Sequence, residues 1–217
     1  SDHSYGFRPG RSAHQAVEMA RAHVAAGHRW CVELDLEKFF DRVDHDILMS
    51  RLARIIKDGR LLKLIRRYLE AEMVDEQGVL KRDKGMPQGG PLSPLLSNIL
   101  LDELDKELER RGHSFCRYAD DCNVYLGSRK AAEHAFETTR QYLESELKLQ
   151  LNLDKSGVAR ASARDFLGYG LIGREPARLK VAPKSAQRLR QKVKDLLRAS
   201  HGTSVAMWRA VAPPCSA

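Results

Sequence analysis

Residues 113–126 read HSFCRYADDCNVYL, and this stretch decides the fold that the rest of the chain is expected to adopt. Strand-forming side chains lie on both sides of Asp120 and Asp121, namely Phe115, Tyr118, Val124, Tyr125 and Leu126. The polar residues between these two runs predict a tight turn, so we expect a β-hairpin. Its two adjacent carboxylates repel each other, and nothing near them in sequence except Arg117 offers a compensating charge.

This carboxylate pair has two interpretations. Aspartate is common in turns, so the dipeptide alone favours an ordinary polar turn. Hard divalent cations such as Mg²⁺, however, prefer carboxylate oxygens and keep water or phosphate at their remaining positions. The pair therefore indicates a metal site only if other carboxylates of the chain reach the same place.

The composition is that of a folded protein. The chain has 217 residues, 42% of them hydrophobic, which suffices for one large domain with a buried core. No apolar run approaches the ~18 residues of a membrane span and no signal peptide opens the chain, so we expect a soluble, intracellular protein. The four cysteines lack the C-x-x-C spacing of zinc ribbons, and Cys31, Cys116 and Cys122 are expected in the core.

The net charge of +8 is concentrated in one tract. From Arg174 to Arg198 there are nine Lys or Arg residues against two acids. Such a tract suits a phosphate backbone, with a solvated helix face as the alternative.

The first 56 residues predict two helices and a strand. Ser12 and Gln15 form a capping box for a helix with Ala13, Ala16, Val17, Ala20 and Val24 on one face, ending near Gly27. Arg8 precedes this helix, where it could meet an anion or merely brace its loop. Residues 30–36 predict a buried strand that contains Asp35. Asp44 is expected to cap a helix that turns Ile47, Leu48, Leu52, Ile55 and Ile56 inward.

The remaining elements follow from periodicity and turn residues. Residues 61–69 and 131–147 predict amphipathic helices, and Gln77-Gly78 a hairpin turn. Residues 84–94 form a Gly/Pro loop, after which Ser93 opens a helix with Leu96, Leu100, Leu104 and Leu108. Alternating leucines at 149, 151 and 153 predict a strand. Residues 166–172 predict another, paired with 179–181 across a turn at Gly173.

These pieces combine into one chemical hypothesis. If the strand with Asp35 lies beside the hairpin in one antiparallel sheet, three carboxylates meet at one point. Three carboxylates can hold two Mg²⁺ ions about 3.5–4 Å apart, an arrangement that serves phosphoryl transfer. The chain has no G-x-x-x-x-G-K-S/T loop and no zinc spacing of histidines that would compete with this hypothesis.

Six motifs in fixed order support it. They are FRPGR (7–11), LDLEKFFDRVDH (34–45), MPQGGPLSPLLSNILL (86–101), RYADD (117–121), LNLDKS (151–156) and FLGY (166–169). In this order the chain closely resembles the reverse transcriptases encoded by bacterial group II introns, from about Tyr5 to Arg198. The resemblance implies an α+β fold: a right-hand polymerase palm with an antiparallel sheet backed by helices, and partial fingers. By this resemblance, residues 1–29 would form part of the fingers and residues 30–182 the palm with inserted finger helices. Residues 183–217 would form the start of the thumb and an irregular tail.

The resemblance also implies roles for single residues. Asp35, Asp120 and Asp121 match the family's metal-binding aspartates, and the backbone of Leu36 would face the triphosphate. Phe40 matches the residue that excludes a ribose 2′-hydroxyl, although Phe39 or Phe40 must instead face the core. The remaining matches are nucleotide contacts at Arg8, Gln88, Gly89 and Lys155, a primer grip at Phe166, Leu167, Gly168 and Tyr169, and thumb contacts at Lys184, Arg188 and Lys192.

The implied activity is RNA-directed DNA polymerisation in the bacterial cytoplasm. Two Mg²⁺ ions, with Mn²⁺ as a substitute, would assist the attack of a primer 3′-oxygen on a dNTP. The partners would be an RNA template, a DNA primer, dNTP and intron RNA, without a membrane. The family's first fingers segment and most of its thumb and maturase domain lack counterparts, so we expect truncation or a frameshift, and weak or no processive synthesis by this chain alone.

Three alternatives remain open. The chain could be an RNA-binding splicing helper without polymerase activity. It could be a reverse transcriptase of a retron, diversity-generating or CRISPR-associated lineage. It could also be a decayed fragment that folds but has no activity.

Overall fold

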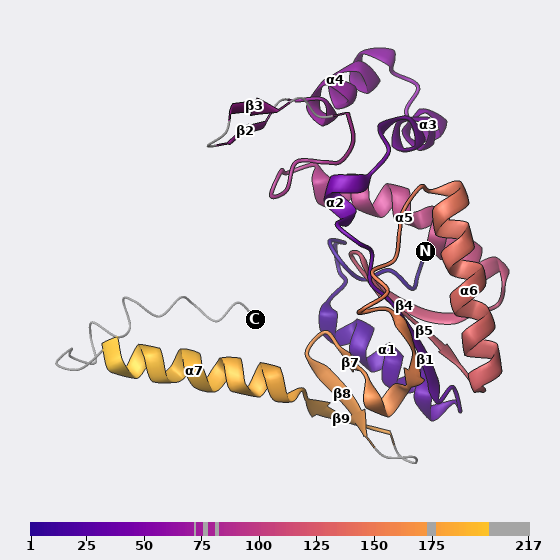
Figure 1. The fold of residues 1–217 in the computed structure, drawn as a ribbon, viewed down its shortest axis with the longest axis vertical. Coiled ribbons are helices and arrows are strands. Elements are labelled where there is room, and N and C mark those ends of the chain that lie inside the picture. Colours follow the sequence, from indigo (N-terminus) through magenta and orange to yellow (C-terminus); the bar gives the residue numbers. More distant parts are fainter. Residues whose placement is uncertain (72, 76–77, 81–82, 173–176, 200–217) are drawn as a thin grey trace.

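The computed structural model describes residues 1–71, 73–75, 78–80, 83–172 and 177–199. Its centre is a four-stranded antiparallel sheet with the strand order β4-β5-β1-β6 (Figure 1). These strands are β1 Trp30–Leu34, β4 Ser114–Tyr118, β5 Asp121–Leu126 and β6 Gly157–Arg160. A bridge between Ser4 and Arg117 adds the N-terminal segment at the β4 edge.

The sheet has a hydrophobic core on each face, because successive side chains of a strand point to opposite sides. Val32 and Leu34 belong to the larger core, to which α3 (His45–Ile55), α4 (Gly59–Leu69), α5 (Ser93–Arg110) and α6 (Arg129–Glu146) contribute. Cys31 belongs to the other core. That core also contains residues of α1 (Ala13–Ala25) and of a three-stranded sheet, β7 (Asp165–Phe166), β8 (Tyr169–Ile172) and β9 (Arg178–Val181).

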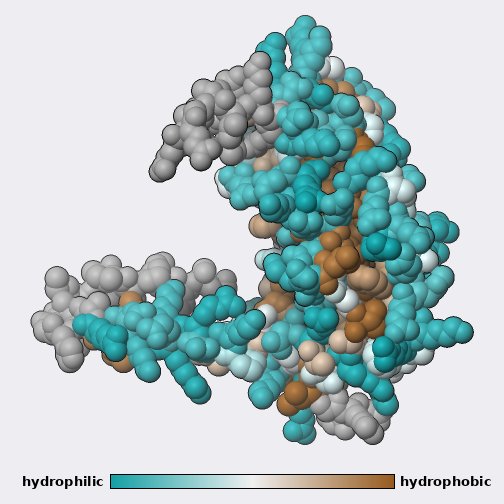
Figure 2. All heavy atoms as spheres, in the orientation of Figure 1, coloured by the Kyte–Doolittle hydropathy of each residue, from teal (hydrophilic) through white to brown (hydrophobic). Residues whose placement is uncertain are grey.

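Two parts extend from this body on the same side in Figure 1. At one end, α2 (Phe39–Arg42) leads to α3 and α4, and the hairpin of β2 (Met73–Asp75) and β3 (Gly78–Leu80) follows. At the other end, α7 (Pro183–Ala199) projects from β9. Figure 2 shows that the surface between these two parts is hollowed.

Most of the predicted elements are confirmed. α1 has the expected capping box and buries Ala16, Val17, Ala20 and Val24. Asp44 caps α3 by accepting from the backbone N–H groups of Asp46 and Ile47. α5 buries all four predicted leucines, β4 and β5 form the predicted hairpin, and β8 pairs with β9. Cys31, Cys116 and Cys122 are buried, as expected.

Two side chains predicted to face inward are exposed. Ile55 is 71% exposed because α3 ends there and the side chain borders a surface cavity. Leu153 is 63% exposed, and residues 149–153 form no strand. The extended run ends instead at a turn, in which the Asn152 side chain accepts from the N–H of Asp154.

Two strands also differ from the prediction. Residues 166–172 are not one strand, because Leu167 (φ 50°) and Gly168 (φ 85°) form a two-residue turn between β7 and β8. Strand β6 was missed, since Gly157 and Ala159 have side chains too small to give an apolar alternation. The turns predicted at Gln77-Gly78 and Gly173, and the tail from residue 200, lie partly or wholly outside the described residues.

Candidate active site

The sheet brings the predicted carboxylates together at one end of the β1–β5 pair. Leu34 of β1 is opposite Cys122 of β5, so Asp35 and Asp121 are the next residues along the two paired strands. Asp120 lies in the two-residue turn between Tyr118 and Asp121. Ala119, the other turn residue, has a φ of 58°, a conformation that glycine adopts more readily than alanine.

Asp35 and Asp120 line one cavity of about 380 Å³. The other lining residues that the sequence predicted for the site are Leu36, Phe40, Gln88 and Lys155. Segments separated by about eighty residues thus converge at one place. Of the residues predicted to bind the metal or the nucleotide, Asp121, Gly89 and Arg8 lie outside this cavity's lining.

Two carboxyl groups at this end of the sheet, those of Asp121 and Glu33, have raised pKa values. Burial raises the pKa of Asp121 to about 6, and the negative charges of Glu33, Asp120 and Asp35 add to this effect. Burial also raises the pKa of Glu33, while Arg164, whose Nη1 is 2.7 Å from Glu33 Oε2, opposes that shift. Glu33 is not among the predicted site residues, although it precedes Asp35 by two residues and so shares its strand face.

The backbone of Asp35 is fixed by the loop that follows α6. The hydroxyl of Ser156 accepts a hydrogen bond from the Asp35 N–H (2.9 Å) and donates one to the Asp35 carbonyl oxygen (3.2 Å). The N–H of Asn152 donates to the same carbonyl oxygen (2.9 Å). The same loop carries Lys155, whose Nζ lies 3.8 Å from Asp35 Oδ2 and supplies an opposite charge.

The two phenylalanines after Asp35 have different environments. Both side chains line the cavity, but Phe39 is 2% exposed and belongs to the larger core, whereas Phe40 is half-buried. Lys38 has a φ of 47° and directly precedes α2, so the stretch that contains both phenylalanines is helical rather than extended. Phe39 is thus the core residue of the pair, and Phe40 remains available to a ligand.

The loop that carries Gln88 is tied to α2. The N–H groups of Gly85 and Met86 donate to the carbonyl oxygens of Val43 and Phe40. The Gln88 amide donates to Asp41 Oδ1 at 3.0 Å. His45, which is 3% exposed, places Nε2 2.7 Å from the carbonyl oxygen of Gly85. No sequence signal indicates this contact, because His45 and Gly85 are 40 positions apart.

The other predicted site residues lie elsewhere. The Arg8 guanidinium donates to the carbonyl oxygens of Ser1 and Ser4 and so braces its own loop. Residues 166–169 form the β7–β8 turn, where Gly168 accepts from the N–H of Ala182 at the start of α7. Lys184, Arg188 and Lys192 are exposed on α7.

Metal-binding groups are only partly assembled. Within the described ranges, no three His, Cys, Asp or Glu side chains are close enough to hold one ion. The carboxylates that line the cavity are those of Asp35, Asp120 and Glu37, and Glu37 is already paired with Arg42, which leaves Asp35 and Asp120 beside Leu36. This set suits a hard cation such as Mg²⁺, which is usually bound by one or two carboxylates and completes its shell with water and phosphate.

No helix of the described residues is long and apolar enough to cross a membrane.

Comparison with known proteins gives a family. Residues 1–171 match the profile of the family described as reverse transcriptase (RNA-dependent DNA polymerase). Protein YkfC of Escherichia coli K12 is 35% identical, over 78% of this chain and 55% of that protein. The group II intron-encoded protein LtrA of Lactococcus lactis is 28% identical, over 86% of this chain and 42% of that protein. The chain thus spans about half the length of these relatives.

Solved structures show the same fold. Telomerase from Candida albicans matches with a TM-score of 0.63 over 84% of this chain and 35% of that one, at 14% identity. Apo telomerase from Candida tropicalis matches with a TM-score of 0.64 over 83% of this chain. These likenesses confirm the predicted palm fold, and the profile confirms the resemblance carried by the six motifs. The chain belongs to the reverse transcriptase family of RNA-dependent DNA polymerases.

Proposed function

We propose that this chain is the catalytic palm of an RNA-directed DNA polymerase of the group II intron type. It would join deoxynucleotides to the 3′-hydroxyl of a primer paired with an RNA template. The observation that supports this most directly is that Asp35, just after β1, and Asp120, in the β4–β5 turn, line one cavity together with Phe40, Gln88 and Lys155. The relative LtrA, a group II intron-encoded protein, supports the choice of lineage.

Asp35 and Asp120 would hold divalent cations, with the Leu36 backbone beside them and Asp121 as a supporting charge. When bound, two such ions stabilise the attacking and the leaving oxygens of a phosphoryl transfer. The raised pKa of Asp121 supports this assignment, because it reflects burial of the carboxyl group and, after that, repulsion by neighbouring carboxylates, and a bound cation would offset both. Mg²⁺ is the expected ion, and Mn²⁺, which also accepts oxygen ligands, is a substitute.

The side chains around the carboxylates would bind the nucleotide. Phe40 would pack under the sugar and exclude a 2′-hydroxyl, while Gln88 and Gly89 would lie against the nucleotide and template. Lys155 would neutralise the leaving pyrophosphate or donate a proton to it. Residues 166–169 would contact the primer, and Lys184, Arg188 and Lys192 of α7 the duplex. Residues 1–29 would then belong to the fingers, 30–182 to the palm and 183–217 to the thumb.

Primer extension on an RNA template with Mg²⁺ tests the proposal. We expect extension by the unmodified chain and a loss of at least a hundredfold in Asp120→Asn, which keeps the shape of the side chain but removes its charge. Asp2→Asn is the matched control, because Asp2 is 91% exposed and pairs only with Arg11 among the described residues. Equal extension by the unmodified chain and Asp120→Asn would refute the assignment.

A second candidate function is RNA binding that assists splicing without polymerisation. The exposed basic residues of α7 and the relation to an intron-encoded protein favour it. Gel-shift assays on intron RNA separate the two candidates. RNA binding without any extension by the unmodified chain would support the second, whereas Asp120→Asn that still binds RNA but no longer extends would support the first.

A further inference from the structure

Arg117 is a buried cation that the proposed chemistry does not use. It is 1% exposed, on the face of β4 that points toward α5, and it pairs with Asp105, which is 0% exposed. Arg117 Nε and Nη2 donate to the two carboxylate oxygens of Asp105, each at 2.7 Å. The carboxylate of Asp105 therefore neutralises Arg117, which does not compensate the charges of Asp120 and Asp121 as its position in sequence suggested.

The remaining guanidinium nitrogen of Arg117, Nη1, reaches the hairpin tip. Nη1 donates to the carbonyl oxygen of Ala119 at 2.8 Å and to Asn98 Oδ1 at 3.0 Å. The Ala119 carbonyl belongs to the peptide unit that joins Ala119 to Asp120. Arg117 therefore fixes the orientation of the peptide plane from which the Asp120 side chain starts.

The N-terminal loop closes on the tip from another side. The Asn98 amide donates to the carbonyl oxygen of Gly6 at 2.9 Å. A Cβ atom on Gly6 would lie only 2.3 Å from the Ala119 nitrogen, so the loop and the turn are in direct contact. The strained φ of Ala119 is thus enforced by groups on α5, β4 and the N-terminal loop together.

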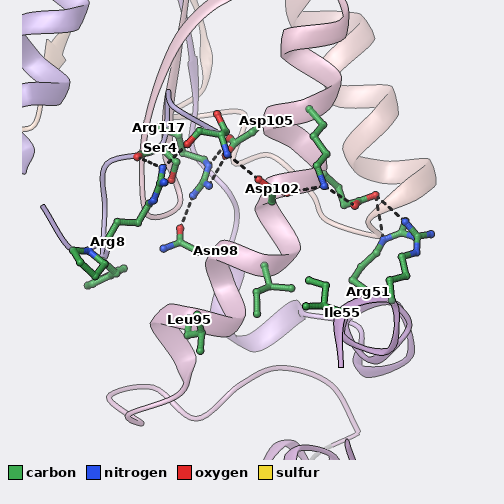
Figure 3. A pocket seen from close by; sticks show the side chains of 16 residues that line it. Ser4, Arg8, Arg51, Ile55, Leu95, Asn98, Asp102, Asp105 and Arg117 are labelled. Atoms are coloured by element: carbon green, nitrogen blue, oxygen red, sulfur yellow. Dashed lines mark hydrogen bonds and ion pairs between the residues drawn. The ribbon is translucent and has the colours of Figure 1, made fainter. Parts of the chain in front are cut away.

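Figure 3 shows these groups from the surface cavity of about 470 Å³ that they border. Asn98 and Asp105 extend from α5 toward Arg117, seven residues apart and so on the same side of that helix. This cavity is separate from the one that Asp35 and Asp120 line, since the two share no described lining residue.

The geometry points to an anchor, formed by Asp105, Arg117 and Asn98, that orients the Ala119–Asp120 peptide and so directs the Asp120 carboxylate into the cavity beside Asp35. Arg117 is a positioning residue in this scheme, because it acts through Asp120 and touches no reactant. The inference rests on the proposed function for its catalytic consequence, but the orientation of the turn can be measured without activity.

The test uses two variants of the anchor. Arg117→Lys keeps a cation beside Asp105, but its three N–H donors share one nitrogen and cannot span the acceptors that the three guanidinium nitrogens of Arg117 reach on Asp105, Asn98 and Ala119. The double variant Asp105→Leu/Arg117→Met replaces the whole buried ion pair by apolar side chains, which proteins often accept without loss of stability. Arg140→Lys is the matched control, since Arg140 forms an ion pair with Glu137 on the surface of α6.

Three measurements follow on each folded variant: chemical denaturation, amide hydrogen exchange of residues 119–121, and the Mg²⁺ dependence of primer extension. We expect exchange at 119–121 to rise at least tenfold in both anchor variants. The half-saturating Mg²⁺ concentration should also rise at least tenfold, with the KM for dNTP at saturating Mg²⁺ within twofold of the unmodified value. Arg140→Lys should change neither the exchange at 119–121 nor the half-saturating Mg²⁺ concentration.

The outcomes separate this inference from the proposed function. If the unmodified chain does not extend primers but exchange at 119–121 rises in the variants, the proposed function fails and the anchor stands. If a folded double variant keeps normal exchange at the turn and a normal Mg²⁺ response, the ion pair serves folding alone and the anchor is refuted.

Discussion

At the scale of single residues, the hairpin tip depends on the absence of a side chain at Gly6. A methyl group there would meet the Ala119 backbone at 2.3 Å, and backbone cannot rotate away as a flexible side chain does. We therefore expect Gly6→Ala to destabilise the fold by about 1–3 kcal/mol, the usual cost of overpacking. Primer extension should fall at least tenfold, because the displaced turn carries Asp120.

Chemical denaturation and primer extension check this prediction against Gly59→Ala. Gly59 is the first residue of α4, and nothing lies within 4 Å of its added Cβ. Alanine there should be neutral or stabilise by up to about 1 kcal/mol, since it favours a helix over glycine. An unchanged midpoint and unchanged activity in Gly6→Ala would contradict the close contact.

A second residue-scale prediction concerns His23 and acid. Burial lowers the pKa of His23, and the neighbouring His3 and His28 lower it further. The unfolded chain therefore binds a proton on His23 at higher pH than the folded chain does. Stability should be fully present above the unfolded pKa of 6.5 and decline as the pH falls below it.

Urea titrations between pH 7.5 and 5 measure this decline. His23→Phe should make it shallower, because phenylalanine cannot take up a proton when the chain unfolds. Part of the decline in stability should remain in His23→Phe, since burial also lowers the pKa of His113. The exposed His14 provides a control, and His14→Phe should leave the slope intact. An identical pH dependence in His23→Phe and the unmodified chain would argue against the assignment.

At the scale of elements, the position of Gln88 depends on how its loop is held to α2. His45 hydrogen-bonds the Gly85 carbonyl oxygen, and no water can replace it readily because His45 is 3% exposed. His45→Phe keeps a ring but leaves that oxygen without its partner, which should cost about 1–3 kcal/mol. Amide exchange at residues 86–90 should rise with the loss of stability. His134→Phe, on the exposed side of α6, should have neither effect.

Elements with local signals could be predicted from the sequence. α1 has its capping box, α5 has leucines at four-residue intervals, and the β4–β5 hairpin has two apolar runs around a polar turn. Elements without such signals could not. β6 has no apolar alternation. The alternating leucines before it predict a strand, but the chain turns at Asn152, whose side chain accepts from the N–H of Asp154, and periodicity does not reveal that bond.

At the scale of the whole molecule, the site could be predicted only in outline. The motif order identified Asp35, Phe40, Gln88, Asp120 and Lys155, which line one cavity. The contacts that hold them could not be read from the sequence, because they join residues distant in the chain. Ser156 binds Asp35 across 121 positions, and Asn98 binds Gly6 across 92. A sequence pattern indicates which face a residue occupies but not its partner on another element.

The last prediction concerns α7, which projects from the body beside the hollowed surface (Figures 1 and 2). Lys184, Arg188 and Lys192 follow one another at four-residue steps and so lie along one side of the helix. If this side follows a nucleic-acid backbone, replacing all three by glutamine should weaken RNA binding. The slope of log K for RNA binding against the logarithm of the salt concentration should become shallower by about 0.7–0.9 for each phosphate contact removed.

A second triple variant separates a specific side from general charge. Arg190, Lys194 and Arg198 follow the same four-residue spacing on another side of α7, and glutamine at these positions removes the same net charge. Filter binding at several salt concentrations should show a clearly larger loss of affinity and slope for the first triple variant. Equal losses would mean that α7 attracts RNA only through its total charge, because long-range attraction depends little on which side carries the cations. A loss confined to the first triple variant would identify the side of α7 that faces the duplex.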